Sequence, residues 1–311
     1  MITFFCLPKP FHGTIGTIQR NAIRSWLALE PVPEIILFGN EQGTAEAAEE
    51  YRLRHIADVE RNEYGTPLVH SMFRLAQEQA SNPHVCYLNA DIILLGDFMQ
   101  TFLHLLDTFA DGRILLTGLR RNVDIREEIN FTNGSEAEEF LCAVKSNASI
   151  DHVGLDYFVF PRGSYRDVKP FAVGRAFLDA WFLYKASIEG LRLIDGTQVV
   201  TALHQNHSSI IGAGDARRVY HLFKDDPEIR RNHDLCGMYP RTFSFLDARY
   251  VLTESGILSK SLLRRMKGSI LSTLSIIAYD ILYPMYPYSY PLLWLGSTFS
   301  NRLLIRKWIV K

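Results

Sequence analysis

The sequence predicts an α/β fold, with a mixed, mostly parallel sheet flanked by helices. Up to about residue 120, short apolar runs alternate with helical patterns, which is typical of parallel strands covered by helices on both faces. The 311 residues are 47% hydrophobic and 22% charged, as in ordinary globular proteins with a substantial core. The net charge of −1 gives no indication of a nucleic-acid-binding protein.

The first part of the chain predicts these elements in order. Residues 2–7 (ITFFCL) form a short apolar strand, and residues 13–29 form an amphipathic helix with Ile15, Ile18 and Trp26 at helical spacing. The elements expected next are a strand over 34–40, a helix over 44–54, a weak strand over 55–59, a helix over 66–80 with Pro67 near its first turn, a strand over 85–88, and, after a further helix, a strand over 113–118.

The middle of the chain changes character. Its expected elements are a helix over 135–146, a strand over 156–163, a helix over 174–186 beginning near Ala176, and a β-branched strand over 197–207. No internal repeat or low-complexity linker interrupts residues 1–255, so we expect one continuous domain there, followed by an extension over 256–311.

The cysteines and the N-terminal residues indicate the cellular compartment in which the protein is expected. Four cysteines lie far apart with no C-x-x-C pair, which argues against a zinc cluster or a disulfide framework and fits a reducing compartment. The start MITFFCLPKPF lacks the basic, apolar pattern of a signal peptide. We therefore expect a cytoplasmic protein.

Asp91 interrupts an apolar stretch, in residues 85–98 (VCYLNADIILLGDF). A buried, unpaired carboxylate is costly, and a cation is one of the few partners that offset the cost. Ligands bind beyond the carboxyl ends of strands in such sheets, and Asp91 follows one. A helix cap or turn residue explains a single Asp equally well.

Two histidines strengthen the metal interpretation. His204 and His207 end the predicted strand over 197–207. Carboxylate oxygens suit hard divalent cations, and an imidazole can complete the shell of Mn²⁺. Residues three apart on an extended strand point to opposite faces, so we expect only one of the two to reach the metal. A structural role is the alternative for a single histidine.

The sequence resembles the GT-A (Rossmann-like) fold of nucleotide-sugar glycosyltransferases over about residues 1–255. The resemblance depends on LPKPF, FGNEQG, RNEYGTPLVHSMFRLA and, above all, YLNADIIL, which is similar to a D-x-D motif. DYFVFPRG, GRAFLDAWFLYKA and HQNH together resemble a bacterial and plant family of nucleotide-diphospho-sugar transferases.

The resemblance implies roles for particular residues. Asp91 stands where the family binds Mn²⁺ or Mg²⁺, and His204 or His207 where it places a later metal ligand. Asn89 replaces the first Asp of the motif, which contacts the donor ribose or the metal. The residues expected by analogy to line the nucleotide pocket are Pro8, Lys9, Asn40 and Glu41.

The chemistry suggests further candidates. Arg61 and Arg20 are candidates for the donor phosphates, although a solvated arginine or an ordinary ion pair explains each equally well. An inverting transfer needs a general base. Asp179, among aromatic residues, is the first candidate and Asp156 the second, and a turn at the start of a strand is the favoured explanation of Asp156. A retaining transfer needs no such base.

Residues 256–311 differ from the rest in composition. They contain eight Lys or Arg residues and a single acid, Asp280. Apolar residues recur at 3–4 spacing from Leu263 to Ile281, and prolines 284, 287 and 291 argue against a spanning helix. Two roles are compatible with this segment: peripheral contact with the inner face of a membrane, or packing over the core of the domain.

The leading hypothesis is a metal-dependent glycosyltransferase that uses a nucleotide-diphospho-sugar, with UDP-sugars as the first choice. The expected acceptor is a carbohydrate or a lipid-linked sugar. The alternatives are a sugar-nucleotide nucleotidyltransferase, whose glycine-rich G-G-x-G-x-R loop the segment PKPFHGTIGTIQR does not supply, and an inactive nucleotide-sugar-binding module, suggested by Asn89.

Overall fold

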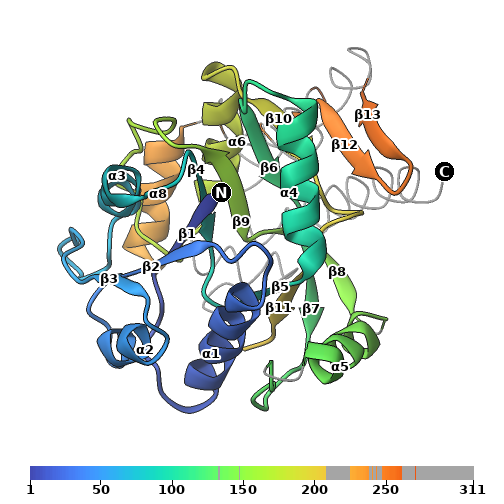
Figure 1. The fold of residues 1–311 in the computed structure, drawn as a ribbon. Coiled ribbons are helices and arrows are strands. Elements are labelled where there is room, and N and C mark those ends of the chain that lie inside the picture. Colours follow the sequence, from blue (N-terminus) through green and yellow to red (C-terminus); the bar gives the residue numbers. More distant parts are fainter. Residues whose placement is uncertain are drawn as a thin grey trace, which may run out of the picture.

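The structure is a computed structural model that describes residues 1–131, 134–146, 148–207, 225–237 and 247–260, together with 240, 243 and 270. Its main sheet has the strand order β13-β12-β10-β6-β9-β4-β1-β2-β3 (Figure 1). The strands are β1 (Ile2–Cys6), β2 (Glu34–Phe38), β3 (Arg54–Ile56), β4 (His84–Leu88), β6 (Ile114–Thr117), β9 (Tyr157–Pro161), β10 (Arg192–Asp195), β12 (Tyr250–Thr253) and β13 (Gly256–Ser259).

Most neighbouring strands of this sheet are parallel. The exceptions are β9, which runs antiparallel to β4 and β6, and β13, which runs antiparallel to β12. The predicted mixed, mostly parallel sheet flanked by helices is therefore confirmed.

Helices cover both faces of the sheet because successive strand residues point to opposite sides. Phe4 packs edge-on against Phe98, with ring centroids 5.4 Å apart, whereas Phe5 packs against Phe73 on the other face at 5.1 Å. The first core contains residues of α1 (Gly13–Leu27), α2 (Thr44–Glu50) and α4 (Gly96–Thr108). The second contains residues of α3 (Val69–Gln79), α6 (Leu178–Ile188) and α8 (Pro227–Cys236).

A second, smaller sheet lies beside the main one in Figure 1, and the sequence did not predict it. Its order is β5-β11-β7-β8, with β5 (Ile92–Leu94), β11 (Ala202–Gln205), β7 (Leu119–Val123) and β8 (Ser149–Leu155). Helix α5 (Gly134–Ser146) contributes to the small core of this sheet. Because β5 begins directly after Asp91, this sheet starts at the carboxyl end of β4.

Several predicted boundaries need correction. The strand expected over 197–207 is limited to Ala202–Gln205, and the helix expected from about Ala176 begins at Leu178. Pro67 precedes α3, which begins at Val69. Strands β10 and β12 were not predicted.

The predicted extension over 256–311 is mostly outside the described residues. Residues 256–259, assigned to it by the sequence, form β13 and pair with β12 in the main sheet. The division at residue 255 and the membrane-surface helix stay predictions. Within the part of the chain that the structure describes, no helix is long and apolar enough to cross a bilayer.

Candidate metal and nucleotide site

Three parallel strands bring half of the predicted residues to one edge of the main sheet. Strand β1 lies between β2 and β4 and pairs in parallel with both. Their carboxyl ends therefore meet at the same edge, where ligands bind in open α/β sheets. Lys9 follows β1, Glu41 follows β2, and Asp91 follows β4.

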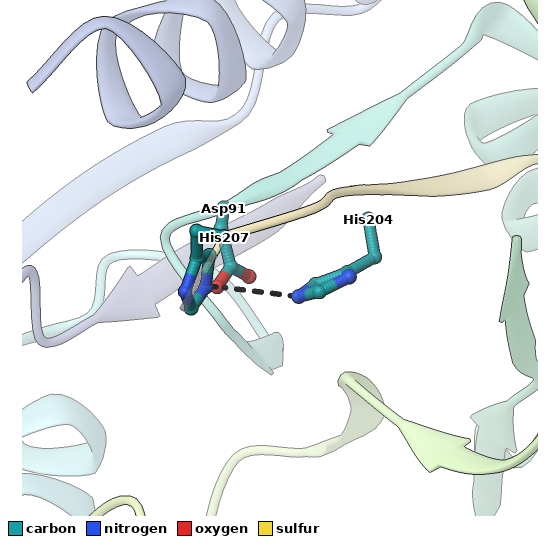
Figure 2. A group of neighbouring side chains, drawn as sticks. All are labelled: Asp91, His204 and His207. Atoms are coloured by element: carbon teal, nitrogen blue, oxygen red, sulfur yellow. Dashed lines mark hydrogen bonds and ion pairs between the residues drawn. The ribbon is translucent and has the colours of Figure 1, made fainter. Parts of the chain in front are cut away.

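Asp91, His204 and His207 converge at this edge (Figure 2). His207 Nε2 lies 2.8 Å from Asp91 Oδ2, and His204 Nε2 lies 3.7 Å from the same oxygen. One ligand atom from each residue falls within 4.8 Å of the others. Two imidazoles and one carboxylate in this arrangement could hold a divalent transition metal.

The two histidines do not point to opposite faces, as the extended strand predicted, but both approach Asp91. The prediction assumed an extended strand through residue 207, but β11 ends at Gln205, and the chain leaves the strand before His207. The side chain and backbone nitrogens of Gln205 donate hydrogen bonds to the Asp91 carbonyl oxygen at 3.2 and 3.3 Å. These bonds hold the two segments together.

The second carboxylate oxygen of Asp91 is a further indication that a cation can bind at this site. Asp91 Oδ1 is buried and accepts no hydrogen bond from the described residues. A buried carboxylate oxygen without a partner is costly, and a bound cation would offset that cost.

The charges of the site suit metal binding at neutral pH. Burial acts to raise the pKa of Asp91, but the hydrogen bond from His207 and nearby positive charges, including Lys9, bring the pKa below its ordinary value. Burial lowers the pKa of His204 to about 4, against the opposing effect of Asp91. Asp91 is therefore ionised and His204 neutral at pH 7, as metal ligands must be.

Asn89, which replaces the first Asp of the motif, contacts Asp156. Its side-chain nitrogen donates to Asp156 Oδ1 at 2.5 Å, and Arg120 donates to Asp156 Oδ2 at 2.9 Å. Burial raises the pKa of Asp156 to about 6, although Arg120 opposes the rise. Both oxygens of Asp156 are thus engaged in holding Asn89 and Arg120.

Asp179, the first candidate for a general base, lies in the first turn of α6. Burial raises its pKa to about 8, and the charge of Asp156 adds to the rise. The backbone of Leu155, at the end of β8, hydrogen-bonds to its carboxyl group. Such a pKa lies close to neutral pH, as acid–base catalysis requires.

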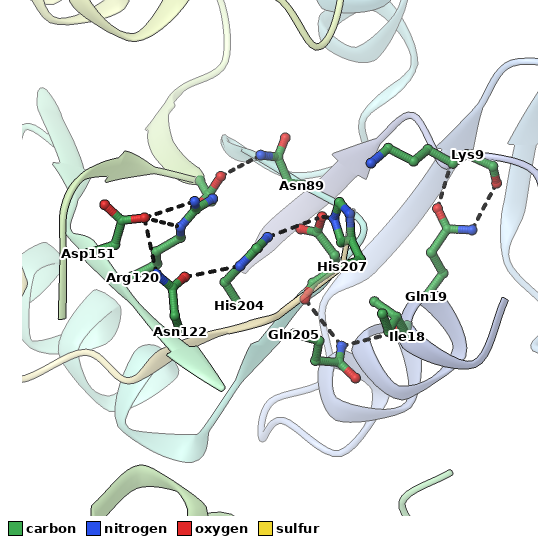
Figure 3. Close-up of polar contacts among 12 residues, drawn as sticks. Lys9, Ile18, Gln19, Asn89, Arg120, Asn122, Asp151, His204, Gln205 and His207 are labelled. Atoms are coloured by element: carbon green, nitrogen blue, oxygen red, sulfur yellow. Dashed lines mark hydrogen bonds and ion pairs between the residues drawn. The ribbon is translucent and has the colours of Figure 1, made fainter. Parts of the chain in front are cut away.

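Apart from Asn89 and Arg20, the predicted donor-binding residues form two groups, of which the first follows β1. Gln19 on α1 holds the Lys9 backbone by accepting from its N–H at 2.6 Å and donating to its carbonyl at 2.8 Å. Figure 3 shows the Lys9 side chain extending toward Asn89 and His207. Pro8, just before it, is buried.

The second group gathers after β2. Arg61 donates hydrogen bonds to Asn40 Oδ1 and to Glu41 Oε1, each at 2.7 Å. Arg20 is not part of this group, because its guanidinium lies over the Phe11 ring and 3.5 Å from Glu50. The role of Arg20 toward the donor phosphates stays a prediction.

The sequence missed a set of polar residues on the small sheet. Asn122, Arg120 and Asp151 form a chain of contacts that ends at His204 (Figure 3). A signal was present in the residues LRRNV of β7, because Arg120 and Asn122, two apart on a strand, share one face.

An open cavity of about 540 Å³ lies away from these residues. It is lined by Arg24, Leu27, Ala28, Tyr51, Glu128, Ile129, Asn130 and Phe131, none of which is a predicted site residue. The cluster of Asp91, His204 and His207 is the better candidate, because its side chains can bind a metal ion.

No protein-family model and no curated protein matches the chain. It is similar in structure to a Pyrobaculum calidifontis mannosyltransferase in complex with GDP-Man and Mn²⁺ (TM-score 0.44, 11% identity, 99% of this chain and 88% of that one). It is also similar to Mycobacterium tuberculosis glucosyl-3-phosphoglycerate synthase in complex with Mg²⁺ and UDP (0.42, 14%, 67% and 72%) and to the bifunctional IspDF of Campylobacter jejuni (0.35, 8%, 62% and 48%). At these TM-scores and sequence identities, the function of this chain has to be inferred from its own residues.

Proposed function

We propose that this chain is a divalent-cation-dependent glycosyltransferase with a nucleotide-diphospho-sugar donor. The observation that carries the proposal is the convergence of Asp91, His204 and His207 at the carboxyl end of β4, with Asp91 Oδ1 buried and unpartnered among the described residues. The resemblance of residues 87–94 (YLNADIIL) to a D-x-D motif supports it.

The three side chains would hold Mn²⁺ or Mg²⁺, and two imidazoles favour Mn²⁺. The cation would act as a Lewis acid on the diphosphate leaving group. Lys9, next to Asp91, adds a positive charge where the diphosphate would lie. Asn40 and Glu41, after β2, are the proposed contacts of the nucleoside. Arg61, which donates hydrogen bonds to both, is a proposed contact of the donor phosphates.

In an inverting transfer, an acceptor hydroxyl oxygen attacks the anomeric carbon and the carbon–oxygen bond to the diphosphate breaks. We propose that Asp179 takes the hydroxyl proton and that the nucleoside diphosphate leaves with the bonding electron pair. The raised pKa of Asp179, about 8, makes it a strong enough base for this transfer.

Calorimetry with UDP, with and without Mn²⁺, tests the binding half of the proposal, and release of UDP or GDP from a set of nucleotide-sugars tests turnover. We expect Mn²⁺-dependent UDP binding that falls at least about 100-fold in Asp91→Asn, together with turnover of one donor. Metal-dependent binding without turnover of any donor would favour the binding module. UDP binding that is indifferent to Mn²⁺ would contradict the proposal.

A further inference from the structure

We infer that Asn122 is a positioning residue that fixes the tautomer of His204, so that Nε2 of His204 presents its lone pair to the metal. The functional consequence of the inference, metal binding by His204, rests on the proposed function. The tautomer itself is a property of the metal-free protein and can be measured without metal. Its evidence is a chain of hydrogen bonds whose direction is fixed at the far end by Arg120.

Arg120 sets the direction because a guanidinium can only donate. Its Nε and Nη2 lie 3.1 and 2.9 Å from Asp151 Oδ2. The Asp151 side chain is buried, and a carboxylate paired with arginine accepts hydrogen bonds. A group that approaches Asp151 Oδ2 from the other side must therefore donate to it.

Asn122 is that group. Its Nδ2 lies 3.3 Å from Asp151 Oδ2, which turns the amide so that Oδ1 faces His204 Nδ1 at 3.1 Å. An amide oxygen only accepts, so His204 Nδ1 must carry the proton. Nε2 is then the unprotonated nitrogen, and it lies 3.7 Å from Asp91 Oδ2. That distance is too long for a hydrogen bond.

The small sheet makes this alignment part of the fold. His204 on β11 and Asn122 on β7 are register partners in a parallel pair. Arg120, two residues before Asn122, lies on the same face of β7. Gly154 on β8 leaves the space that Arg120 needs, because a Cβ at that position would lie 2.5 Å from Arg120 Nε.

The histidine tautomer is measurable directly. In ¹⁵N-edited NMR of the metal-free wild-type protein at pH 7.5, we expect His204 to show a protonated Nδ1 and an unprotonated Nε2. In Asn122→Ala we expect the Nε2–H tautomer to become populated. A wild-type His204 protonated at Nε2, or a tautomer unchanged by Asn122→Ala, would overturn the inference.

Metal affinity supplies the functional measurement. Calorimetry with Mn²⁺ alone should show a 10- to 100-fold loss in Asn122→Ala, the range found for residues that orient metal ligands. Asn206→Ala is the matched control, because Asn206 donates to Asp124 on the exposed surface of the same segment and should retain wild-type affinity.

A substitution of similar shape separates positioning from packing. Asn122→Leu fills the volume of the amide but offers no acceptor to His204 Nδ1. We expect the same loss of Mn²⁺ affinity and the same shift toward the Nε2–H tautomer as in Asn122→Ala. Wild-type affinity and a wild-type tautomer in Asn122→Leu would overturn the inference. Absence of Mn²⁺ uptake by the wild type would instead contradict the proposed function, since the tautomer is read without metal.

Discussion

At the scale of single residues, Asp179 is the clearest case of a side chain whose environment works against its charge. Burial at the start of α6 and the nearby charge of Asp156 raise its pKa to about 8. A residue kept in a costly position is a candidate for catalysis, because active sites concentrate perturbed carboxylates.

Asp179→Asn is therefore predicted to stabilise the protein and to reduce turnover. The native pKa, about 8, lies above the ordinary value of 3.8, so the unfolded chain loses this proton first and wild-type stability falls as pH rises between these values. In urea denaturation the variant should be several kcal/mol more stable than wild type at pH 8.5, with little difference near pH 4.

Donor turnover in the same variant should fall about 100-fold, and wild-type turnover should rise with pH toward 8 as the base form appears. Unchanged turnover would remove Asp179 from the chemistry, and a stability difference that does not vary with pH would contradict its raised pKa.

Asn89 is predicted to be the better residue at its position, although an Asp would complete the motif. Asn89→Asp would place a second carboxylate 2.5 Å from Asp156 Oδ1, where the amide now donates. We expect a loss of about 1–3 kcal/mol at pH 7.5, measured by thermal denaturation, that shrinks below pH 5 as the carboxyls protonate. If Asn89→Asp were as stable as wild type at both pH values, the amide at this position would not be needed.

At the scale of elements, α8 is fixed to the domain by buried polar contacts. Arg175, before α6, pairs with Asp226 and Glu228 at the start of the helix, and Glu228 is 4% exposed. Asp226 also caps the helix by accepting from two backbone N–H groups.

Arg175→Met is predicted to cost about 3 kcal/mol, because it leaves Glu228 buried without its cationic partner. The control is Arg231→Met, which removes an exposed ion pair with Glu63 and should cost less than about 1 kcal/mol. Urea unfolding of both variants measures the difference, and equal losses would show that burial of Glu228 does not matter.

The elements that the sequence predicted are those with strong apolar patterns. Strands β1, β2 and β4 are buried on both faces, and their apolar runs stand out in the sequence. Strand β7 is mostly half-buried and polar, so its pairing with β11 and β8 gave no apolar signal. Asn122 was missed for this reason.

At the scale of the whole molecule, the candidate site joins segments that are far apart in the chain. Asp91 was predictable because a carboxylate interrupts an apolar run, and the histidines because they follow a β-branched segment. The approach of both histidines depends on where β11 ends, which is set by its pairing with β5 and β7. Composition and periodicity carry no information about that pairing.

The account depends most on a divalent cation at the carboxyl end of β4. Anomalous diffraction from crystals of the full chain grown with Mn²⁺ and UDP tests it most directly. We predict a single strong anomalous peak from a manganese ion coordinated by Asp91, His204 and His207. We predict no such peak in crystals of Asp91→Asn. A manganese peak at another place, or none near Asp91 in the wild-type protein, would contradict the account.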